Sequence, residues 1–319
     1  MSMKGSKFTA ATVVAIFAGP LFAADPQLLN LVMPDAKVLA GVNVDQAKGT
    51  PFGLYLLTQI QTQDQHLQQI VALTGFDPTR DVHELLFATN GAPGSQKGLA
   101  LASGTFDGPR IVAMAQTVGA MTETYNGVTL IEDPQKSHGV AFLSGMIAVA
   151  GDVASVKAAI DRQTLATPLP AAVATQVNQW SGTQDAWIVL AVPPASLQPA
   201  NAPNPPNPAM QNALQSIQQA AGGVKFGDQI AVTGQAQTDT AQNASGLAGV
   251  GQFLVSLVQT KAQQTNPQLA AVLPSVKVAA SGNLVNVSLS VPEAQLEQVV
   301  KPTLPSTPQG ARPRAQRRL

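Results

Sequence analysis

Short apolar runs alternate with amphipathic stretches along residues 24–165. Runs rich in Val, Leu, Ile and Phe and bounded by turn residues predict strands at 37–44, 82–90, 97–106, 139–143 and 146–150. Apolar positions at helical spacing, each stretch opened by a capping residue, predict helices from Thr50-Pro51, from near Asp64, from Asp107 and from Asp152. The first half is therefore a mixture of helices and strands.

Short turns set the expected direction of the strands. The stretch TETYNGVTLIED at 122–133 has Asn126-Gly127 at its centre, which is the strongest short signal for a hairpin. Strands 139–143 and 146–150 meet at Ser144-Gly145. Strands joined by such short turns pair antiparallel.

The second half reads as a looser copy of the first. DAKVLAGVNVDQ at 35–46 parallels DAWIVLAVPPAS at 185–196, and residues 139–160 parallel residues 276–300. Between these stretches we expect a helix at 207–221, a strand at 229–238, a long helix at 240–261 and a short helix at 267–273. The pattern predicts an internal duplication.

The resulting fold class is α+β with two similar halves. Each half is expected to be a mostly antiparallel sheet with helices packed on one face, in the order β-α-β-(β)-α-β-β-α, and one continuous sheet is compatible with this order. The first half spans 24–165. The second spans 166–300 and contains a proline-rich loop at 193–208.

The N-terminus has the three parts of a secretory signal peptide. Lys4 and Lys7 precede an apolar stretch at 8–18, and small residues follow Gly19-Pro20. We expect cleavage after Ala23, with Ala24 as the alternative, and export to the periplasm or the medium of a bacterium. The apolar stretch is shorter than the ~20 residues of a membrane-spanning helix, and no later stretch reaches that length, so no transmembrane segment is expected after cleavage.

Composition narrows the classes of partner. Charged residues make up only 11% of the chain, against roughly 25% in an average globular domain. All 18 acidic residues lie within 24–300, where they outnumber the basic ones, which argues against a nucleic acid as partner. The absence of cysteine excludes disulfides and thiolate metal sites.

The last stretch, 301–319, is basic and rich in proline, and it is expected to be disordered. Its arginines suggest a weak contact with anionic envelope components; they are Arg312, Arg314, Arg317 and Arg318.

No motif in the sequence predicts a catalytic, cofactor-binding or metal-binding residue. Ser144 and Ser281 lie in predicted turns, outside any Gly-x-Ser-x-Gly motif. His66, His83 and His138 are isolated, and the zinc-peptidase pattern that His83-Glu84 begins has Phe87 in place of its second histidine.

Two pairs of carboxylates, Glu132-Asp133 and Asp77/Asp81, could also carry chemistry. The second pair fits a turn in which aspartates cap backbone N–H groups. A glycosidase cleft would need more aromatic residues than the 4% found here.

The stretch MIAVAGDVASVKAAIDR at 146–162 poses a choice between phosphate binding and a helix cap. It has one glycine where a dinucleotide site has three. Asp152 at the N-cap would satisfy the free N–H groups itself and repel an anion. We therefore interpret this stretch as a structural cap.

Several of these stretches resemble a family of uncharacterised exported bacterial proteins of unknown function. The resemblance rests on GFDPTRD at 75–81, of the form GFDPxxD, and on GDVASVKAAID at 151–161, of the form GDxxxVxxAID. It implies the fold but no activity. We expect a non-enzymatic binding or envelope-associated module. A hydrolase whose site is assembled from scattered residues, and a membrane-surface or cell-wall protein acting through its basic tail, remain as alternatives.

Overall fold

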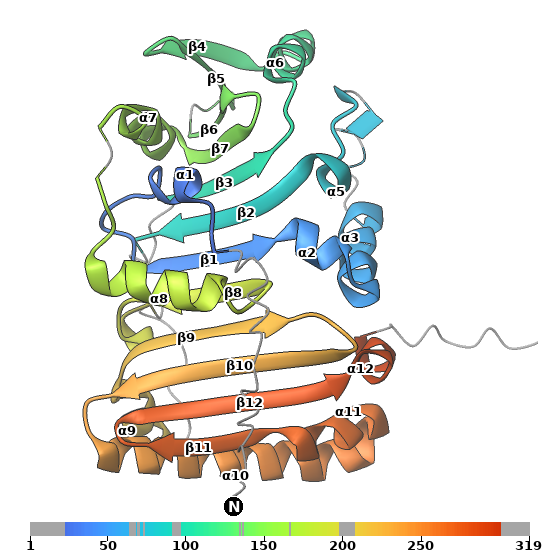
Figure 1. Cartoon of the computed structure of the whole chain (residues 1–319), viewed down its shortest axis with the longest axis vertical. Coiled ribbons are helices and arrows are strands. Elements are labelled where there is room, and N and C mark those ends of the chain that lie inside the picture. Colours follow the sequence, from blue (N-terminus) through green and yellow to red (C-terminus); the bar gives the residue numbers. More distant parts are fainter. Residues whose placement is uncertain are drawn as a thin grey trace, which may run out of the picture.

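One antiparallel sheet of 12 strands runs through both halves of the chain (Figure 1). The structure is a computed structural model, and it describes residues 23–63, 68, 71–72, 74–90, 97–133, 135, 137–165, 167–197 and 208–300. In sheet order the strands are β11 (Lys277–Ser281), β12 (Leu284–Pro292), β10 (Gln229–Thr238), β9 (Ile217–Lys225), β8 (Ala186–Leu190), β1 (Val38–Asn43), β2 (Val82–Thr89), β3 (Gly98–Gly104), β7 (Ile147–Asp152), β6 (His138–Ser144), β5 (Val128–Glu132) and β4 (Met121–Tyr125). The α+β class and the antiparallel pairing are thus confirmed.

Helices connect the strands at nearly every step that is not a hairpin. In the first half they are α1 (Pro26–Leu29), α2 (Val44–Lys48), α3 (Pro51–Gln63), α5 (Pro78–Asp81), α6 (Gly108–Thr117) and α7 (Val153–Arg162). In the second half they are α8 (Ala171–Ser181), α9 (Pro208–Gln215), α10 (Ala241–Thr265), α11 (Pro267–Val272) and α12 (Glu293–Val300), with short 3₁₀ turns at Pro194–Leu197 and Leu273–Ser275.

The sheet has two chemically different faces, because successive side chains of a strand point to opposite sides. Leu86, Leu101 and Val149 lie opposite one another on β2, β3 and β7 and are fully buried. They pack with residues of α1, α7 and α8 in the main core, so we call this side the α1 face. Burial of each leucine contributes about 1.5–3 kcal/mol.

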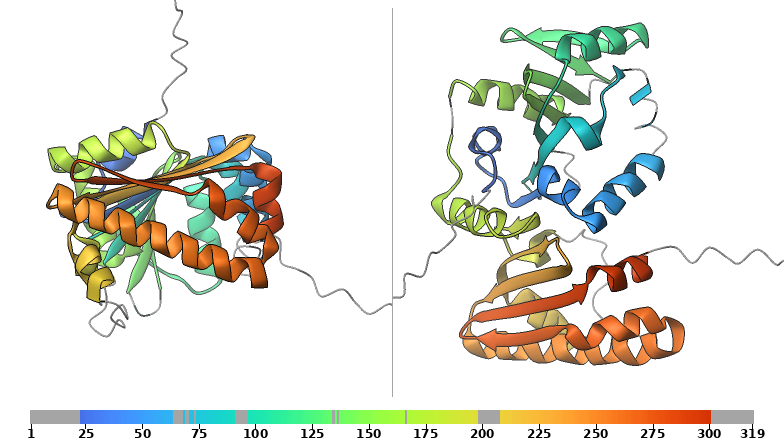
Figure 2. Two further views of the ribbon diagram at one scale, coloured as in Figure 1. Left: turned by 90° about the horizontal axis from the view of Figure 1, so that it is seen from below. Right: turned by 45° about the vertical axis from the view of Figure 1, so that its right-hand side comes forward.

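The opposite side, the α6 face, carries α2, α3, α5 and α6 over the first half of the sheet. In the second half α10 packs on this side against β11 and β12, while α8 lies on the α1 face (Figure 2). The helices of the first half therefore cover both faces, whereas the sequence pattern placed them on one. An amphipathic stripe shows which side of a helix is buried but not which face of the sheet it covers.

The two halves meet where β1 pairs antiparallel with β8. Gly41 of β1 lies opposite Trp187 of β8, and a Cβ atom added at Gly41 would come within 2.5 Å of the indole ring. The indole thus lies across the backbone of β1 on the α1 face, and only glycine leaves it room.

The order of the strands is the same in both halves when read outward from this junction. From β1 the order is β1-β2-β3-β7-β6, and from β8 it is β8-β9-β10-β12-β11. β4 and β5 extend the sheet beyond β6 in the first half alone.

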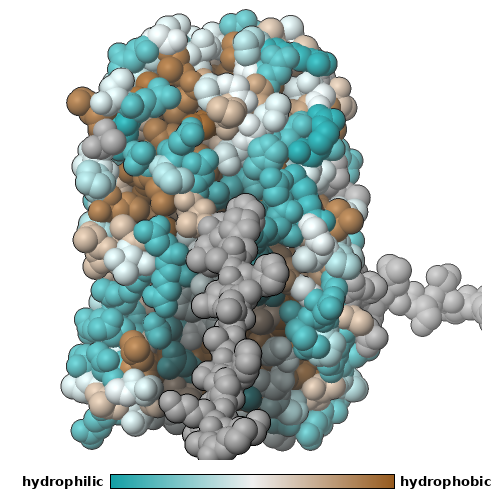
Figure 3. Space-filling view, in the orientation of Figure 1, coloured by the Kyte–Doolittle hydropathy of each residue, from teal (hydrophilic) through white to brown (hydrophobic). Residues whose placement is uncertain are grey.

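The α1 face of β9, β10 and β12 is polar. Its residues include Gln219, Gln235, Gln237 and Asn286. In Figure 3 the coloured surface on either side of the grey atoms in the lower part of the view is mainly hydrophilic, and larger hydrophobic areas lie in the upper part.

Local signals were accurate where a turn or a cap fixes the backbone. β4 and β5 form the predicted hairpin, with positive φ at Asn126 (48°) and Gly127 (82°). Helix α10 begins after Thr240, whose side chain accepts a hydrogen bond from the N–H of Asn243.

The helix predicted at 207–221 is wrong beyond residue 215. α9 ends at Gln215, and Ile217–Lys225 is strand β9, which pairs with both β8 and β10. Gln and Ala favour a helix, but without β9 the facing edges of β8 and β10 would have no partner strand.

No helix within the described ranges is both long enough and apolar enough to span a membrane. The predicted signal peptide before Ala23, His66, most of the proline-rich loop and the basic tail fall outside the described residues.

The junction between the halves gives the first testable prediction. Gly41→Ala should lower the free energy of unfolding by about 1–3 kcal/mol, because the added methyl group overlaps the Trp187 ring. Urea unfolding followed by circular dichroism measures this change.

Gly246→Ala is the matched control. A Cβ at Gly246 in α10 meets nothing within 4 Å, so this variant should be unchanged or up to about 1 kcal/mol more stable. If Gly41→Ala were as stable as the unmodified protein, the proposed packing of Trp187 would be wrong.

Candidate functional site

A cavity of about 620 Å³ lies between the α6 face of the sheet and the helices that cover it. Its size is within the range of about 300–1,000 Å³ typical of small-molecule sites. The lining residues come from helices α2, α3, α5 and α6, from the segment before α5, and from strands β2, β3, β5, β6 and β7. They are Val44, Leu57, Thr74, Phe76, Pro78, Thr79, Val82, Leu85, Ala100, Leu101, Ala102, Phe106, Ile111, Met114, Ala115, Val118, Ile131, Val140, Phe142, Ala148, Val149 and Ala150.

Four alanines form the floor of this cavity. Ala100 and Ala102 alternate along β3 with the buried Leu99 and Leu101. Ala148 and Ala150 of β7 lie directly opposite Ala102 and Ala100. Large side chains therefore fill the α1 face while methyl groups line the α6 face, and the missing side-chain volume is the origin of the cavity.

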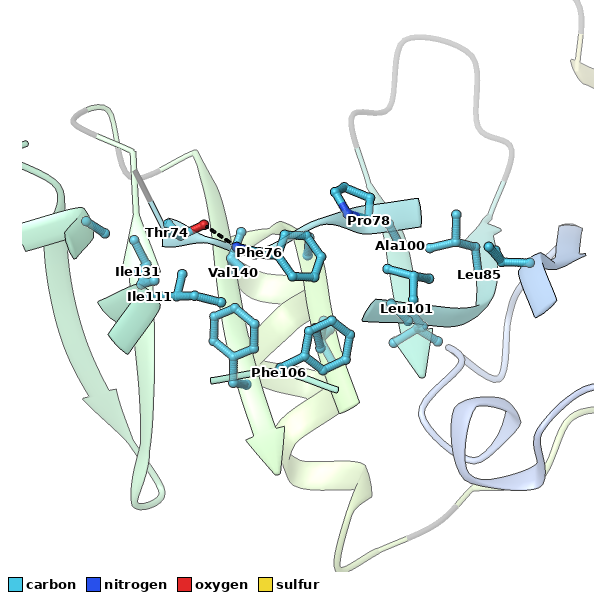
Figure 4. Close-up of a pocket in the computed structure, with 18 of the residues that line it drawn as sticks. Thr74, Phe76, Pro78, Leu85, Ala100, Leu101, Phe106, Ile111, Ile131 and Val140 are labelled. Carbon is cyan, nitrogen blue, oxygen red and sulfur yellow. Dashed lines mark hydrogen bonds between the residues drawn. The ribbon is translucent and has the colours of Figure 1, made fainter. Parts of the chain in front are cut away.

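Three phenylalanines form one wall. The ring centroids of Phe76 and Phe106 are 5.8 Å apart, and those of Phe106 and Phe142 are also 5.8 Å apart. Figure 4 shows Phe76 and Phe106 at the centre of the site, with Ile111 and Ile131 on one side and Leu85 and Ala100 on the other. The aromatic rings keep α6 and the segment before α5 apart from the alanine floor.

Thr74 and Thr79, the two polar residues among the described ones in the lining, have hydrogen bonds of their own. The Thr74 hydroxyl oxygen accepts a hydrogen bond from the N–H of Phe76 at 3.1 Å (Figure 4). The Thr79 hydroxyl donates to Asp77 Oδ1 at 2.7 Å. The cavity thus offers an apolar environment, in which water would find few partners.

A second hollow of about 390 Å³ adjoins the first. The two share the lining residues Ala100 and Ala150, so they are neighbours on the α6 face. Val38, Ala40 and Phe87 line the second hollow, together with the polar side chains of His138 and Asp152. The second hollow is therefore more polar than the first.

Asp152 has the structural role that the sequence predicted. Its Oδ1 accepts a hydrogen bond from the N–H of Ser155 at 3.0 Å, and its Oδ2 accepts one from the N–H of Gly98 at 3.1 Å. Burial acts to raise the pKa of Asp152, but these hydrogen bonds outweigh it and the pKa is lowered. Both oxygens are thus occupied, and an incoming phosphate would meet a carboxylate instead of free N–H groups.

The GFDPTRD stretch is also a cap. Asp77 Oδ1 accepts from the N–H of Thr79 at 2.9 Å, and Asp81 Oδ2 accepts from the N–H of Asp77 at 2.8 Å. Arg80 pairs with Asp81 at 2.6 Å. A hydrogen bond from this guanidinium is the main cause of the lowered pKa of Asp81.

The histidines and serines that could carry hydrolytic chemistry are not arranged for it. Ser137 Oγ donates to Asp133 Oδ2 at 2.7 Å, and His138 Nδ1 lies 3.5 Å from the same oxygen. A catalytic triad requires the histidine between the hydroxyl and the acid, whereas here the aspartate lies between them. Ser144 accepts a hydrogen bond from the N–H of Met146 within its turn.

The remaining candidates are scattered. His83 Nδ1 contacts Asp45 at 2.8 Å, and Glu132 is buried at the end of β5. Within the described residues no three His, Asp or Glu side chains are close enough to hold a metal ion.

Sequence reasoning missed the cavity, although its signal is present. The stretches LALAS at 99–103 and IAVAG at 147–151 alternate large and small apolar residues in phase. The period of two predicts a strand in each stretch, whereas the cavity follows from the difference in side-chain volume between the two faces of these strands.

Comparisons with known proteins bear on the fold. No protein-family model matches the chain, and no curated protein matches it. Two crystal forms of a protein designated TP0453 are similar in structure. Form I has 12% sequence identity and a TM-score of 0.51, over 87% of this chain and 97% of that one. Form III has 13% identity and a TM-score of 0.55, over 85% and 96% of the two chains. At this identity the similarity shows the fold alone.

The cap at α7 gives the second prediction. Asp152→Ala should lower the free energy of unfolding by about 1–2 kcal/mol at pH 7, because it leaves the N–H groups of Ser155 and Gly98 without their acceptor. The pKa of Asp152 is lower in the folded state, so this contribution is present above the unfolded pKa of about 3.9 and lost as the pH falls through the folded pKa. Chemical unfolding at several pH values measures it.

Asp107→Ala is the control. Asp107 caps α6 through a single hydrogen bond, to the N–H of Arg110 at 3.2 Å, so its removal should cost less, about 0.5–1 kcal/mol. Equal stability of Asp152→Ala and the unmodified protein would contradict the assignment.

Proposed function

We propose that this protein is an exported, non-enzymatic binding protein that holds an apolar small molecule in the cavity beneath α6. The cavity itself carries the proposal, because a partly open space of about 620 Å³ lined by apolar side chains leaves apolar surface accessible to water. Exposed apolar hollows of this kind are typical of sites that bind ligands.

The proposed ligand is a molecule with an unbranched or compact apolar body. Burial of apolar surface contributes about 25 cal/mol per Å², and the described residues of the lining include no charged group to orient an ionic ligand. A ligand longer than the main cavity would extend over Ala100 and Ala150 into the second hollow. Its polar end would then lie near His138 and Asp152.

Export is proposed from the N-terminal pattern of two lysines, an apolar stretch and small residues before Ala24. The low content of charged residues and the absence of cysteine are consistent with it. A carrier of apolar molecules outside the cytoplasm would need such a cavity, because its ligand is poorly soluble in water.

We further infer that the chain arose by internal duplication. The equal strand order on both sides of the β1–β8 junction supports this origin. In the second half, α10 packs closely on the sheet through Ala244 and Ala248, in a cluster with Val285. The duplicated halves would then have diverged, one keeping space for a ligand and the other filling it.

Filling the cavity gives the third prediction. Ala148→Leu places a larger side chain on the floor, so it should weaken the binding of a fluorescent fatty acid by at least about 10-fold. Titration of the purified protein with 11-(dansylamino)undecanoic acid measures the affinity. Thermal unfolding should show unchanged or raised stability, because the new side chain fills empty apolar space.

Ala231→Leu is the matched control. Ala231 is a half-buried alanine of β10 on the α1 face, away from the cavity, and its substitution should leave probe binding unchanged. Undiminished binding by Ala148→Leu, or equal loss in both variants, would refute the proposed site.

A further inference from the structure

The peptide bond between residues 23 and 24 lies at the start of the described part of the chain. Ala23 is exposed, whereas Ala24 is 4% exposed. The backbone nitrogen of Ala24 donates a hydrogen bond to Ser181 Oγ at 3.0 Å, and Ser181 is itself buried. Ala24 is thus anchored to a side chain 157 positions away.

A carboxylate without a cationic partner lies next to this anchor. The N–H of Asp25 donates to both oxygens of Glu84, at 3.1 and 3.3 Å. Glu84 comes from β2 and is partly buried on the α1 face, and no Lys, Arg or His of the described chain forms an ion pair with it. Burial raises the pKa of Glu84 to about 7.

The nitrogen of Ala24 is close to this carboxylate. Nitrogen atoms of consecutive residues are at most about 3.7 Å apart, and the nitrogen of Asp25 is 3.1 Å from Glu84 Oε2. The nitrogen of Ala24 therefore lies within about 7 Å of Glu84, a separation at which charges in a partly buried site interact appreciably.

The end of α8 also favours a positive charge at this position. Ser181 is the last residue of α8, and the C-terminus of a helix carries a partial negative charge. α8 itself contains no charged residue, so nothing on that helix competes for a cation.

We propose that cleavage after Ala23 creates a cationic partner for Glu84. The new α-ammonium group of Ala24, held by Ser181 Oγ, forms a buried structural ion pair with the Glu84 carboxylate in the mature protein. Peptide-bond hydrolysis by a signal peptidase, with water as the second reactant, converts a neutral amide into an ammonium group with three donors. The inference rests on the export part of the proposed function and is independent of the ligand.

The structure favours cleavage after Ala23 over cleavage after Ala24. The second cut would remove Ala24, which is buried in the main core, together with its hydrogen bond to Ser181. The first cut leaves the folded body intact.

Few other charges face this site. Asn43 of β1 and Ser103 of β3, which flank Glu84 in the sheet, are uncharged. Asp25 accepts a hydrogen bond from the N–H of Gln27, and Asp185, which follows α8, pairs with Lys225 at 2.6 Å. Asp25 is the one charged group that adds to the raised pKa of Glu84.

Two chains that differ in one charge test the proposal. One is residues 24–319 with a free amino group, and the other is residues 23–319 with an acetylated N-terminus, which keeps the amide of Ala24. In the acetylated chain Glu84 has a folded pKa of about 7, above its unfolded value of 4.5. Its folding equilibrium constant should therefore fall as the pH rises from 5 to 7.5, by roughly 60-fold.

In the free-amine chain the ammonium group lowers the pKa of Glu84, so the same pH change should alter the constant by less than about 3-fold. The α-amino group has an unfolded pKa of about 7.7–8.0, which pairing raises in the folded state. The contribution of the α-amino group to the free energy of unfolding is therefore complete below its unfolded pKa, and it is lost as the pH rises through its folded pKa.

Glu84→Gln should abolish the difference between the two chains, since it removes the titrating group. Glu123→Gln is the control: Glu123 of the edge strand β4 pairs with Lys157 at the end of the sheet, five strands away from β2, and its substitution should leave the difference intact. Intact mass of the protein secreted from the full-length chain should correspond to a start at Ala24. Identical pH profiles of the two chains, or a secreted protein that starts elsewhere, would overturn the proposal.

Discussion

The alternation of large and small side chains along β3 and β7 is the constraint on which the rest of the structure depends. Because a strand directs successive residues to opposite faces, Leu99 and Leu101 lie on one side of β3 and Ala100 and Ala102 on the other. The leucine side closes a dense core with α1, α7 and α8. The alanine side leaves the space in which the proposed ligand binds.

The packing on the α1 face stabilises the fold. It contains the Trp187–Gly41 contact that joins the two halves and the anchor of Ala24 on Ser181. Since this side is densely packed, the α6 face can remain incompletely filled without loss of the fold. A cavity destabilises the packing around it. A fold with a binding site on one face of the sheet therefore needs dense packing on the other face.

The sequence predicted the elements well where local chemistry is decisive. The Asn126-Gly127 hairpin and the cap at Asp152 follow from the conformations and hydrogen bonds that these residues prefer. The predicted helix at 207–221 is wrong over residues 217–221, the first part of β9, because the pairing of this strand with β8 and β10 overrides the preference of Gln and Ala.

The candidate site could be predicted from the sequence only in part. The alternating alanines are visible in the sequence, but the packing of α6 and of Phe76 over them depends on contacts between distant segments. In the sequence Glu84 is recognisable only as part of an incomplete zinc-peptidase pattern. Its position beside residues 24 and 25 follows from the topology of the sheet and not from sequence spacing.

The most direct test of the central claim is mass spectrometry of the protein purified from its own cell envelope or medium, first under native conditions and then after extraction with organic solvent. The account predicts about one apolar molecule per chain in the unmodified protein and a clear loss of it in the variant with leucine at position 148. An unmodified protein that carries no such molecule, or a variant that retains it in equal amount, would contradict the account.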